Sequence, residues 1–131
     1  MPGIAPKLPL HLDPSDLHVY KATKTLKATI RQNLKMLVLT SPGERIMMPE
    51  YGVGIRNFLF SNDSYQTRQD ISSKIRKQTS IYMPFVNLVG VDVRDIPDNA
   101  VASSGASMGL FVLIKYTAPG IPGGDILELS F

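Results

Sequence analysis

Apolar residues between Ala22 and Thr40 recur every three or four positions, at Leu26, Ile30, Leu34, Leu37 and Val38. This spacing gathers them on one face of a helix, so the pattern predicts an amphipathic helix over residues 22–40. Ser41, Pro42 and Gly43 follow, and proline cannot continue a helix while glycine allows a turn. The helix is therefore expected to end here.

A second helix is expected from Tyr65 to Tyr82. Asp63 and Ser64 precede it and are good N-cap residues, and Pro84 stops it. Its apolar face is thin and consists of Ile71, Ile75 and Tyr82. A face this narrow predicts a helix at a sheet edge or against a partner rather than deep in a core.

The segment between the two helices predicts a compact, irregular structure. Residues 46–48 are expected to form a short strand before Pro49, and residues 51–54 are expected to form a further turn. Ile55 to Phe60 has the apolar spacing of a short helix.

The last third of the chain changes to a period of two, which is typical of strands. Residues 89–94 alternate valine with other residues, Met108 to Tyr116 form a more apolar run, and Asp125 to Phe131 alternate again. Residues 98–105 and 119–124 are the polar and Pro/Gly-rich connections. Helices first and strands last predict an α+β domain: two main helices packed on one face of a small, mostly antiparallel sheet, with a short helix between them.

Composition indicates one folded domain with an arm in front of it. The chain has 131 residues, 44% of them hydrophobic, and no apolar run long enough to span a membrane. Residues 1–19 are rich in proline and predict an extended arm rather than a secretory signal. No cysteine is present, and His11 and His18 would need further ligands from elsewhere, so no metal site is predicted.

Basic residues form one stripe on the first predicted helix, at Lys24, Lys27, Arg31 and Lys35. We expect this stripe to lie well away from the apolar face, either as a solvated surface or as a docking surface for an acidic neighbour. The net charge of +3 does not decide between the two. Nucleic-acid binding is not favoured, because no aromatic residues alternate with these charges and no known reader motif is present.

The turn after the first helix combines glycines with charged residues. Gly43, Gly52 and Gly54 suit backbone conformations or close approaches that a side chain would obstruct. Arg45 lies between Glu44 and Glu50 and could bridge both carboxylates, so we expect this bridge to hold the loop together.

The run from Leu39 to Phe60 contains, in order, a threonine, Pro-Gly-Glu-Arg, Pro-Glu-Tyr-Gly and a short helix ending in Leu-Phe. It resembles the signature of the small baseplate wedge proteins of contractile phage tails, a family once labelled lysozyme-like. The resemblance covers residues 20–117 in pattern, except that residues 83–85 read Met-Pro-Phe where many relatives have Glu-Pro-Arg. The matching positions are Pro42, Gly43, Glu44, Arg45, Pro49, Glu50, Tyr51, Gly52, Gly54, Leu59 and Phe60.

This resemblance implies a structural protein of the virion, in the tail baseplate, without enzymatic activity or cofactor. The domain would span residues 20–131, be made in the host cytoplasm and occupy the particle in six copies or a multiple of six. Implied partners are baseplate wedge proteins and the tail sheath subunit, with no nucleic acid, membrane or small-molecule substrate. On this interpretation the chain initiates sheath assembly by strand addition, and its arm orders on a neighbour. The sheath-contact strand would be Asp125, Ile126, Leu127, Glu128, Leu129, Ser130 and Phe131.

The lysozyme-like label also raises an enzymatic alternative, a peptidoglycan-degrading glycosidase of the tail. Glu44 and Glu50 would then be its carboxylate pair. Arg45 argues against this, because it would hold both groups ionised whereas a glycosidase needs one protonated acid. A phosphate-binding loop is excluded, since residues 52–54 lack the following Gly-Lys-Ser/Thr.

Overall fold

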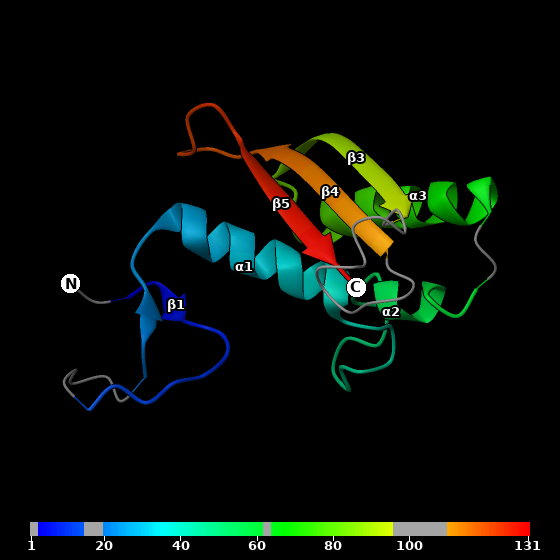
Figure 1. Cartoon of the computed structure of the whole chain (residues 1–131). Helices are drawn as coiled ribbons and strands as arrows, with labels where there is room; N and C mark the ends of the chain where they lie inside the picture. Colours follow the sequence, from blue (N-terminus) through cyan, green and yellow to red (C-terminus); the bar gives the residue numbers. More distant parts are fainter. Residues whose placement is uncertain (1–2, 15–19, 62–63, 96–109) are drawn as a thin grey trace, which may run out of the picture.

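The structure is a computed structural model of the chain, and it describes residues 3–14, 20–61, 64–95 and 110–131. Helices α1 and α3 lie on one face of a three-stranded antiparallel sheet, with the short α2 between them in the chain (Figure 1). The predicted α+β architecture is thus confirmed. The elements are β1 (Ala5–Pro6), β2 (Ala22–Thr23), α1 (Leu26–Leu39), α2 (Ile55–Phe58), α3 (Tyr65–Tyr82), β3 (Asn87–Asp95), β4 (Leu110–Thr117) and β5 (Asp125–Ser130).

Helix α1 begins later than predicted, because Ala22 and Thr23 pair with the arm instead. The Thr25 side chain caps it by accepting a hydrogen bond from the Ala28 N–H at 3.3 Å. At the other end the Thr40 N–H donates to the Met36 carbonyl at 2.9 Å. The buried face of α1 contains Thr29, Ile30, Leu34, Leu37 and Val38.

Helix α3 has the predicted bounds. Ser64 is its N-cap and accepts a hydrogen bond from the Thr67 N–H at 3.1 Å, while Asp63 lies outside the described residues. Its buried residues Ile71 and Ile75 pack in the core beneath the sheet, and α3 contacts the edge strand β3. This position agrees with the expectation from its thin apolar face.

The sheet has the strand order β3-β4-β5, and its register sets the two faces. On β4, Val112, Ile114 and Tyr116 are buried against the helices, and Leu127 and Leu129 of β5 join them. The β3–β4 pairing is interrupted by a bulge between Leu88 and Gly90, whereas the β4–β5 pairing is regular. The predicted connection at residues 98–105 lies outside the described residues.

The strand predicted at residues 46–48 is wrong. This segment is a turn, closed by hydrogen bonds from the Met48 N–H to the Arg45 carbonyl and from the Tyr51 N–H to the Met48 carbonyl. The apolar side chains that suggested a strand have no core to enter, and Ile46 and Met47 are 94% and 93% exposed.

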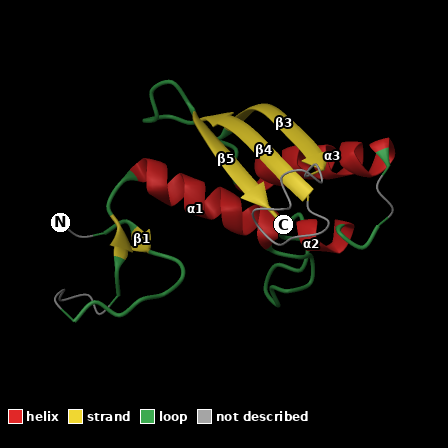
Figure 2. Ribbon diagram, viewed as in Figure 1, coloured by secondary structure: helices red, strands yellow, loops and turns green. Residues whose placement is uncertain are grey.

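The N-terminal arm is drawn beside the start of α1, apart from the sheet (Figure 2). Ala5 and Pro6 pair with Thr23 and Ala22 in a two-stranded antiparallel sheet. The Gln32 side chain holds the arm against α1. It accepts a hydrogen bond from the Leu8 N–H and donates one to the Pro6 carbonyl, both at 2.9 Å. Within the described residues, no helix has the length and apolar character to span a membrane.

Candidate assembly surfaces

Residues 40–54, the motif turn, fold back onto the end of α1. The Val53 N–H donates to the Leu37 carbonyl at 3.0 Å and the Gly54 N–H donates to the Thr40 carbonyl at 2.9 Å. Carbonyls that the last turn of a helix leaves without intrahelical partners thus receive donors from the motif turn. The motif therefore acts as an extended C-terminal cap of α1.

Gly52 is the tightest position of the motif turn. Its φ is +110°, and a Cβ here would lie 2.1 Å from the Thr40 carbonyl oxygen. Gly43 also has a positive φ, of +93°, but a Cβ there would meet nothing within 4 Å. Any side chain at position 52 would prevent this close approach to the Thr40 carbonyl.

Gln78 of α3 holds the other side of the motif turn, and the sequence analysis missed it. Its Oε1 accepts from the Gly52 N–H and its Nε2 donates to the Glu50 carbonyl, both at 3.0 Å, and the residue is 8% exposed. A signal was present, because Gln78 follows Ile75 by three residues on the apolar face of α3. A polar residue at such a position predicts a buried partner.

The expected bridge from Arg45 to Glu44 and Glu50 is not formed. Among the described residues Arg45 makes no ion pair, and its guanidinium carbon instead lies 3.9 Å from the centre of the Tyr51 ring. The Tyr51 ring in turn meets the Tyr82 ring edge-on, with centroids 4.9 Å apart. Arg45 therefore covers an aromatic pair, and both glutamates are exposed.

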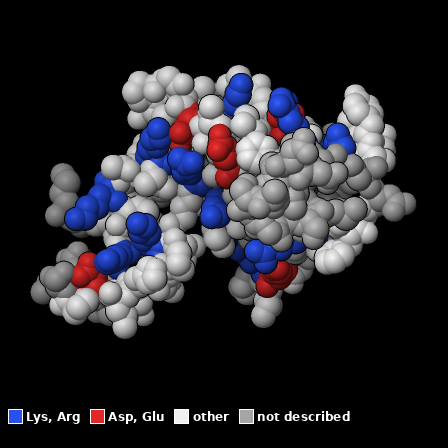
Figure 3. All heavy atoms as spheres, in the orientation of Figure 1, with Lys and Arg blue, Asp and Glu red and all other residues white. Residues whose placement is uncertain are grey.

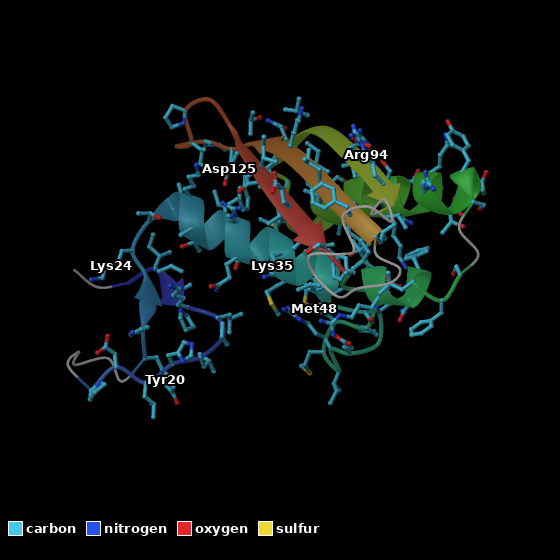
Figure 4. The ribbon with its side chains drawn as sticks, in the orientation of Figure 1. Tyr20, Lys24, Lys35, Met48, Arg94 and Asp125 are labelled. Carbon is cyan, nitrogen blue, oxygen red and sulfur yellow. The ribbon has the colours of Figure 1, made fainter. Side chains whose placement is uncertain are left out.

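Not all motif residues serve the fold. Leu59 is 41% exposed and Phe60 is 93% exposed, and the exposed Ile46 and Met47 belong to the motif turn. Figure 4 labels Met48 on this turn. Exposed apolar side chains on an ordered turn and on the end of α2 offer a surface that a protein partner can bury.

The free edge of β5 is the second candidate surface. Leu110 and Phe131 exchange hydrogen bonds in both directions, at 3.1 and 3.0 Å. Because such pairs alternate along an antiparallel ladder, Leu129 and Leu127 also point their backbone groups toward β4. The backbone groups that point away from β4 are those of Ile126, Glu128 and Ser130, and within the described chain no other strand pairs with this edge.

The outer edge of β3 is less regular. Its pairing with β4 shifts at the bulge, where Val89 is 65% exposed. A bulge bends a strand and interrupts the even spacing of its backbone groups. The bulge affects the start of this edge, since Gly90 to Asp95 pair regularly with β4. The edge of β5 carries no bulge along its paired length.

An ion-pair cluster joins α1 to the start of β5. The Asp125 carboxylate lies 3.2 Å from Lys27 Nζ and 3.9 Å from the Arg31 guanidinium, and it accepts a hydrogen bond from the Tyr116 hydroxyl at 2.9 Å. Burial alone would raise the pKa of Asp125, but hydrogen bonds from Tyr116, the Ile126 N–H and Lys27 outweigh it and lower the pKa. Burial and the bond to Asp125 raise the pKa of Tyr116.

This cluster corrects the expected position of the basic stripe. Lys24 precedes α1, and Lys27 and Arg31 lie at the border between the helix and β5 rather than well away from the buried face. Figure 3 shows basic atoms running from the arm along α1, with acidic atoms of β5 beside them. The sequence could not reveal this, because Asp125 lies about one hundred residues further along the chain.

Among the described residues, the two glutamates of the glycosidase alternative do not line a groove. A shallow groove of about 270 Å³ lies on the outer face of the sheet, and neither Glu44 nor Glu50 borders it. The described residues contain no cluster of histidine, aspartate and glutamate that could hold a metal ion, and His18 lies outside them. The groove is lined by Gly90, Val91, Asp92, Arg94, Phe111, Leu113 and Lys115.

Comparisons with known proteins identify the family and the fold of this chain. The family described as Baseplate wedge protein gp25 matches residues 24–117. The cryo-EM structure of the anti-feeding prophage baseplate contains a similar chain, with a TM-score of 0.68 and 26% identity, covering 88% of this chain and 85% of that one. A candidate tail lysozyme from Geobacter sulfurreducens has the same fold, with a TM-score of 0.66 and 22% identity, covering 85% and 94%. No curated protein matches this chain.

Proposed function

This chain belongs to the baseplate wedge protein gp25 family, and we propose that it joins other wedge proteins in a contractile-tail baseplate and starts the sheath there. The family and the anti-feeding prophage neighbour make it a structural component of a tail baseplate. The sheath subunit would contribute an extended segment that pairs with β5. Several copies would act together in one particle.

The free edge of β5 is the observation that carries this proposal. A strand added here would hydrogen-bond to outward backbone groups of Glu128 and Ser130, because the Ile126 N–H already donates to the Asp125 carboxylate. The opposite edge has the bulge, so β5 is the favoured site. An exposed, regular edge would otherwise be a risk for aggregation, and an assembly partner explains why it is kept.

The wedge partners would bind at the motif turn and the end of α2, which lie near the C-terminal end of β5 (Figure 1). Ile46, Met47 and Phe60 are each more than nine-tenths exposed, and they belong to the stretch that carries the family motif. Burying one such side chain stabilises an interface by roughly 1.5–3 kcal/mol. This separates the wedge-binding surface from the sheath-binding edge.

Glycosidase activity is the weaker alternative. Glu44 and Glu50 are exposed on the motif turn, outside the groove that the sheet forms. The lysozyme name belongs to a neighbour whose 22% identity carries only the fold. A cell-wall clearing assay should give no activity, and clearing that is lost on Glu44→Gln would establish the enzyme.

The experiment that tests strand addition is a Glu128→Pro variant. Deleting residues 125–131 would be a poor test, because Leu127 and Leu129 are in the core. Glu128 is exposed and its N–H points away from β4, so proline removes an outward donor and leaves the β4 ladder intact. We expect the variant to fold and to lose binding of the cognate sheath subunit in a pull-down.

Glu128→Ala is the matched control, because it removes the same side chain and keeps the N–H. It should bind the sheath subunit as the wild type does. Equal binding by all three proteins would refute strand addition at β5.

A further inference from the structure

The border between the free edge of β5 and helix α1 carries the basic residues Lys27, Arg31 and Lys35, of which the first two bind Asp125. We propose that the segment added to β5 has acidic side chains at the alternate positions that face α1, and that Lys35, assisted by Arg31, selects them. This inference rests on the proposed strand addition and names the chemistry that the edge selects.

The faces of the sheet decide which side chains of an added strand would meet α1. Asp125, Leu127 and Leu129 point toward the helices, while Ile126 and Glu128 point to the outer face. Side chains directly opposite each other on neighbouring strands lie on the same face. Every second residue of an added strand, those opposite Leu127 and Leu129, would therefore point toward α1.

Asp125 already shows how an acidic side chain is held in this position. It is the first helix-facing residue of β5, and its carboxylate is bound by Lys27 and Arg31. It also accepts a hydrogen bond from the Ile126 N–H, one of the outward donors. The added segment is therefore expected to pair with the groups from Glu128 onward, beyond the part of the edge that Asp125 occupies.

Lys35 is the next cation along this border. In Figure 1, α1 and β5 run in the same general direction, and Figure 4 labels Asp125 and Lys35 on the side of the molecule that faces the viewer. Eight helical residues from Lys27 to Lys35 rise by about 12 Å. Four strand residues from Asp125 to Leu129 rise by about 13 Å. Lys35 thus lies at about the level of Leu129 along this border, turned about 80° further around the helix than Lys27.

Within the described residues, Lys35 is the cation of this border that forms no ion pair. It is exposed, and it forms no ion pair with any residue in the described part of the chain. Arg31 is 49% exposed and reaches Asp125 at 3.9 Å, which leaves it able to bind a second carboxylate. A segment that carries lysine or arginine here would be repelled.

The same charges disfavour the N-terminal arm of a second copy as the occupant. The described arm and β2 region carry Lys7, Lys21 and Lys24. Like charges next to Lys35 and Arg31 would oppose its docking. A partner segment with carboxylates is complementary to these cations. Its binding should therefore weaken as the salt concentration rises.

The test measures binding of the cognate sheath subunit to Lys35→Glu, Lys77→Glu and the two Glu128 variants. Lys77 is an exposed lysine of α3, which contacts β3 at the opposite edge of the sheet from β5. Lys77→Glu makes the same change in net charge as Lys35→Glu. We expect Lys35→Glu to weaken binding roughly three- to tenfold, with the difference shrinking as salt rises, and Lys77→Glu to leave binding unchanged. Changing single acidic residues of the sheath segment to lysine should then restore binding to Lys35→Glu.

The outcomes separate this inference from the proposed function. If Glu128→Pro abolishes binding while Lys35→Glu and Lys77→Glu bind as the wild type does, strand addition holds and acidic selection is overturned. If Glu128→Pro binds normally, strand addition fails and the inference fails with it. If the folded wild-type protein does not bind the sheath subunit, strand addition and acidic selection are both overturned. If Lys35→Glu loses binding and a lysine variant of the sheath segment restores it, acidic selection is established.

Discussion

The motif turn and the free edge of β5 use their backbone groups in opposite ways. In the motif turn, the N–H groups of Gly52, Val53 and Gly54 all bind acceptors within the chain. On β5, the groups of Glu128 and Ser130 point outward, past the last strand of the sheet. A family motif can therefore be the part of the chain that holds the fold together, while the surface offered to a partner has a plain alternating sequence.

This difference predicts two kinds of mutational effect. Changes in the motif turn should reduce the free energy of unfolding, because they leave buried polar groups without hydrogen-bond partners or force backbone segments apart. Changes on the β5 edge should reduce binding and leave stability nearly unchanged, because water already solvates those groups.

Gly52→Ala should have the largest effect on stability, a loss of about 3 kcal/mol or more. The new Cβ would collide with the Thr40 carbonyl oxygen at a φ of +110°. Urea unfolding measures the loss. Gly43→Ala is the control, with a similar φ and open space around the Cβ, and it should cost only about 1 kcal/mol. Equal losses for the two would show that φ and not the close approach matters.

Gln78→Ala should cost the next most, about 2–3 kcal/mol. It leaves the Gly52 N–H and the Glu50 carbonyl without the partners that tie the motif turn to α3. The control is Gln66→Ala on the exposed face of the same helix, which should change the free energy of unfolding by less than about 0.5 kcal/mol. A loss no greater than that control would mean that the motif turn holds without α3.

Asp125→Asn should cost less, about 0.5–1 kcal/mol at neutral pH, because Lys27 and Arg31 are about half exposed and water screens the pairs. The folded-state pKa of Asp125 is lowered, so its contribution is fully present above the unfolded pKa of about 3.9 and is lost as pH falls through the lower folded-state pKa. The difference in the free energy of unfolding between wild type and variant should therefore be full at pH 7 and shrink as pH falls below about 4. If the difference in the free energy of unfolding does not change with pH, the effect of the substitution does not come from the charge of Asp125.

Glu128→Pro should have a small effect on stability, a loss of about 1 kcal/mol or less, which comes from fixing φ and not from a lost hydrogen bond. Its N–H is not part of the β4 ladder, so the fold loses no hydrogen bond. Thermal unfolding followed by circular dichroism measures this, beside the pull-down that should show loss of sheath binding. A large loss of stability would mean that the edge contributes to the fold, as the motif turn does.

The sequence predicted regular elements better than it predicted long-range contacts. The bounds of α3 and the β5 strand followed from periodicity and local capping, which depend on neighbours in the chain. The strand at residues 46–48 was wrong because apolar residues on an exposed turn have the same local pattern as those in a strand. The position of the basic stripe was also misjudged, since its partner Asp125 is remote in sequence. Gln78 could have been found, because its polar side chain breaks the apolar face of α3.

The bulge at Val89 has a consequence for stoichiometry. A subunit with two regular edges could pair with copies of itself on both sides and grow without limit into a fibril. The bulge disrupts the start of the β3 edge, so on the proposed function each copy accepts one added strand, at β5. The number of strands that a ring of these subunits would accept then equals the number of subunits in the ring.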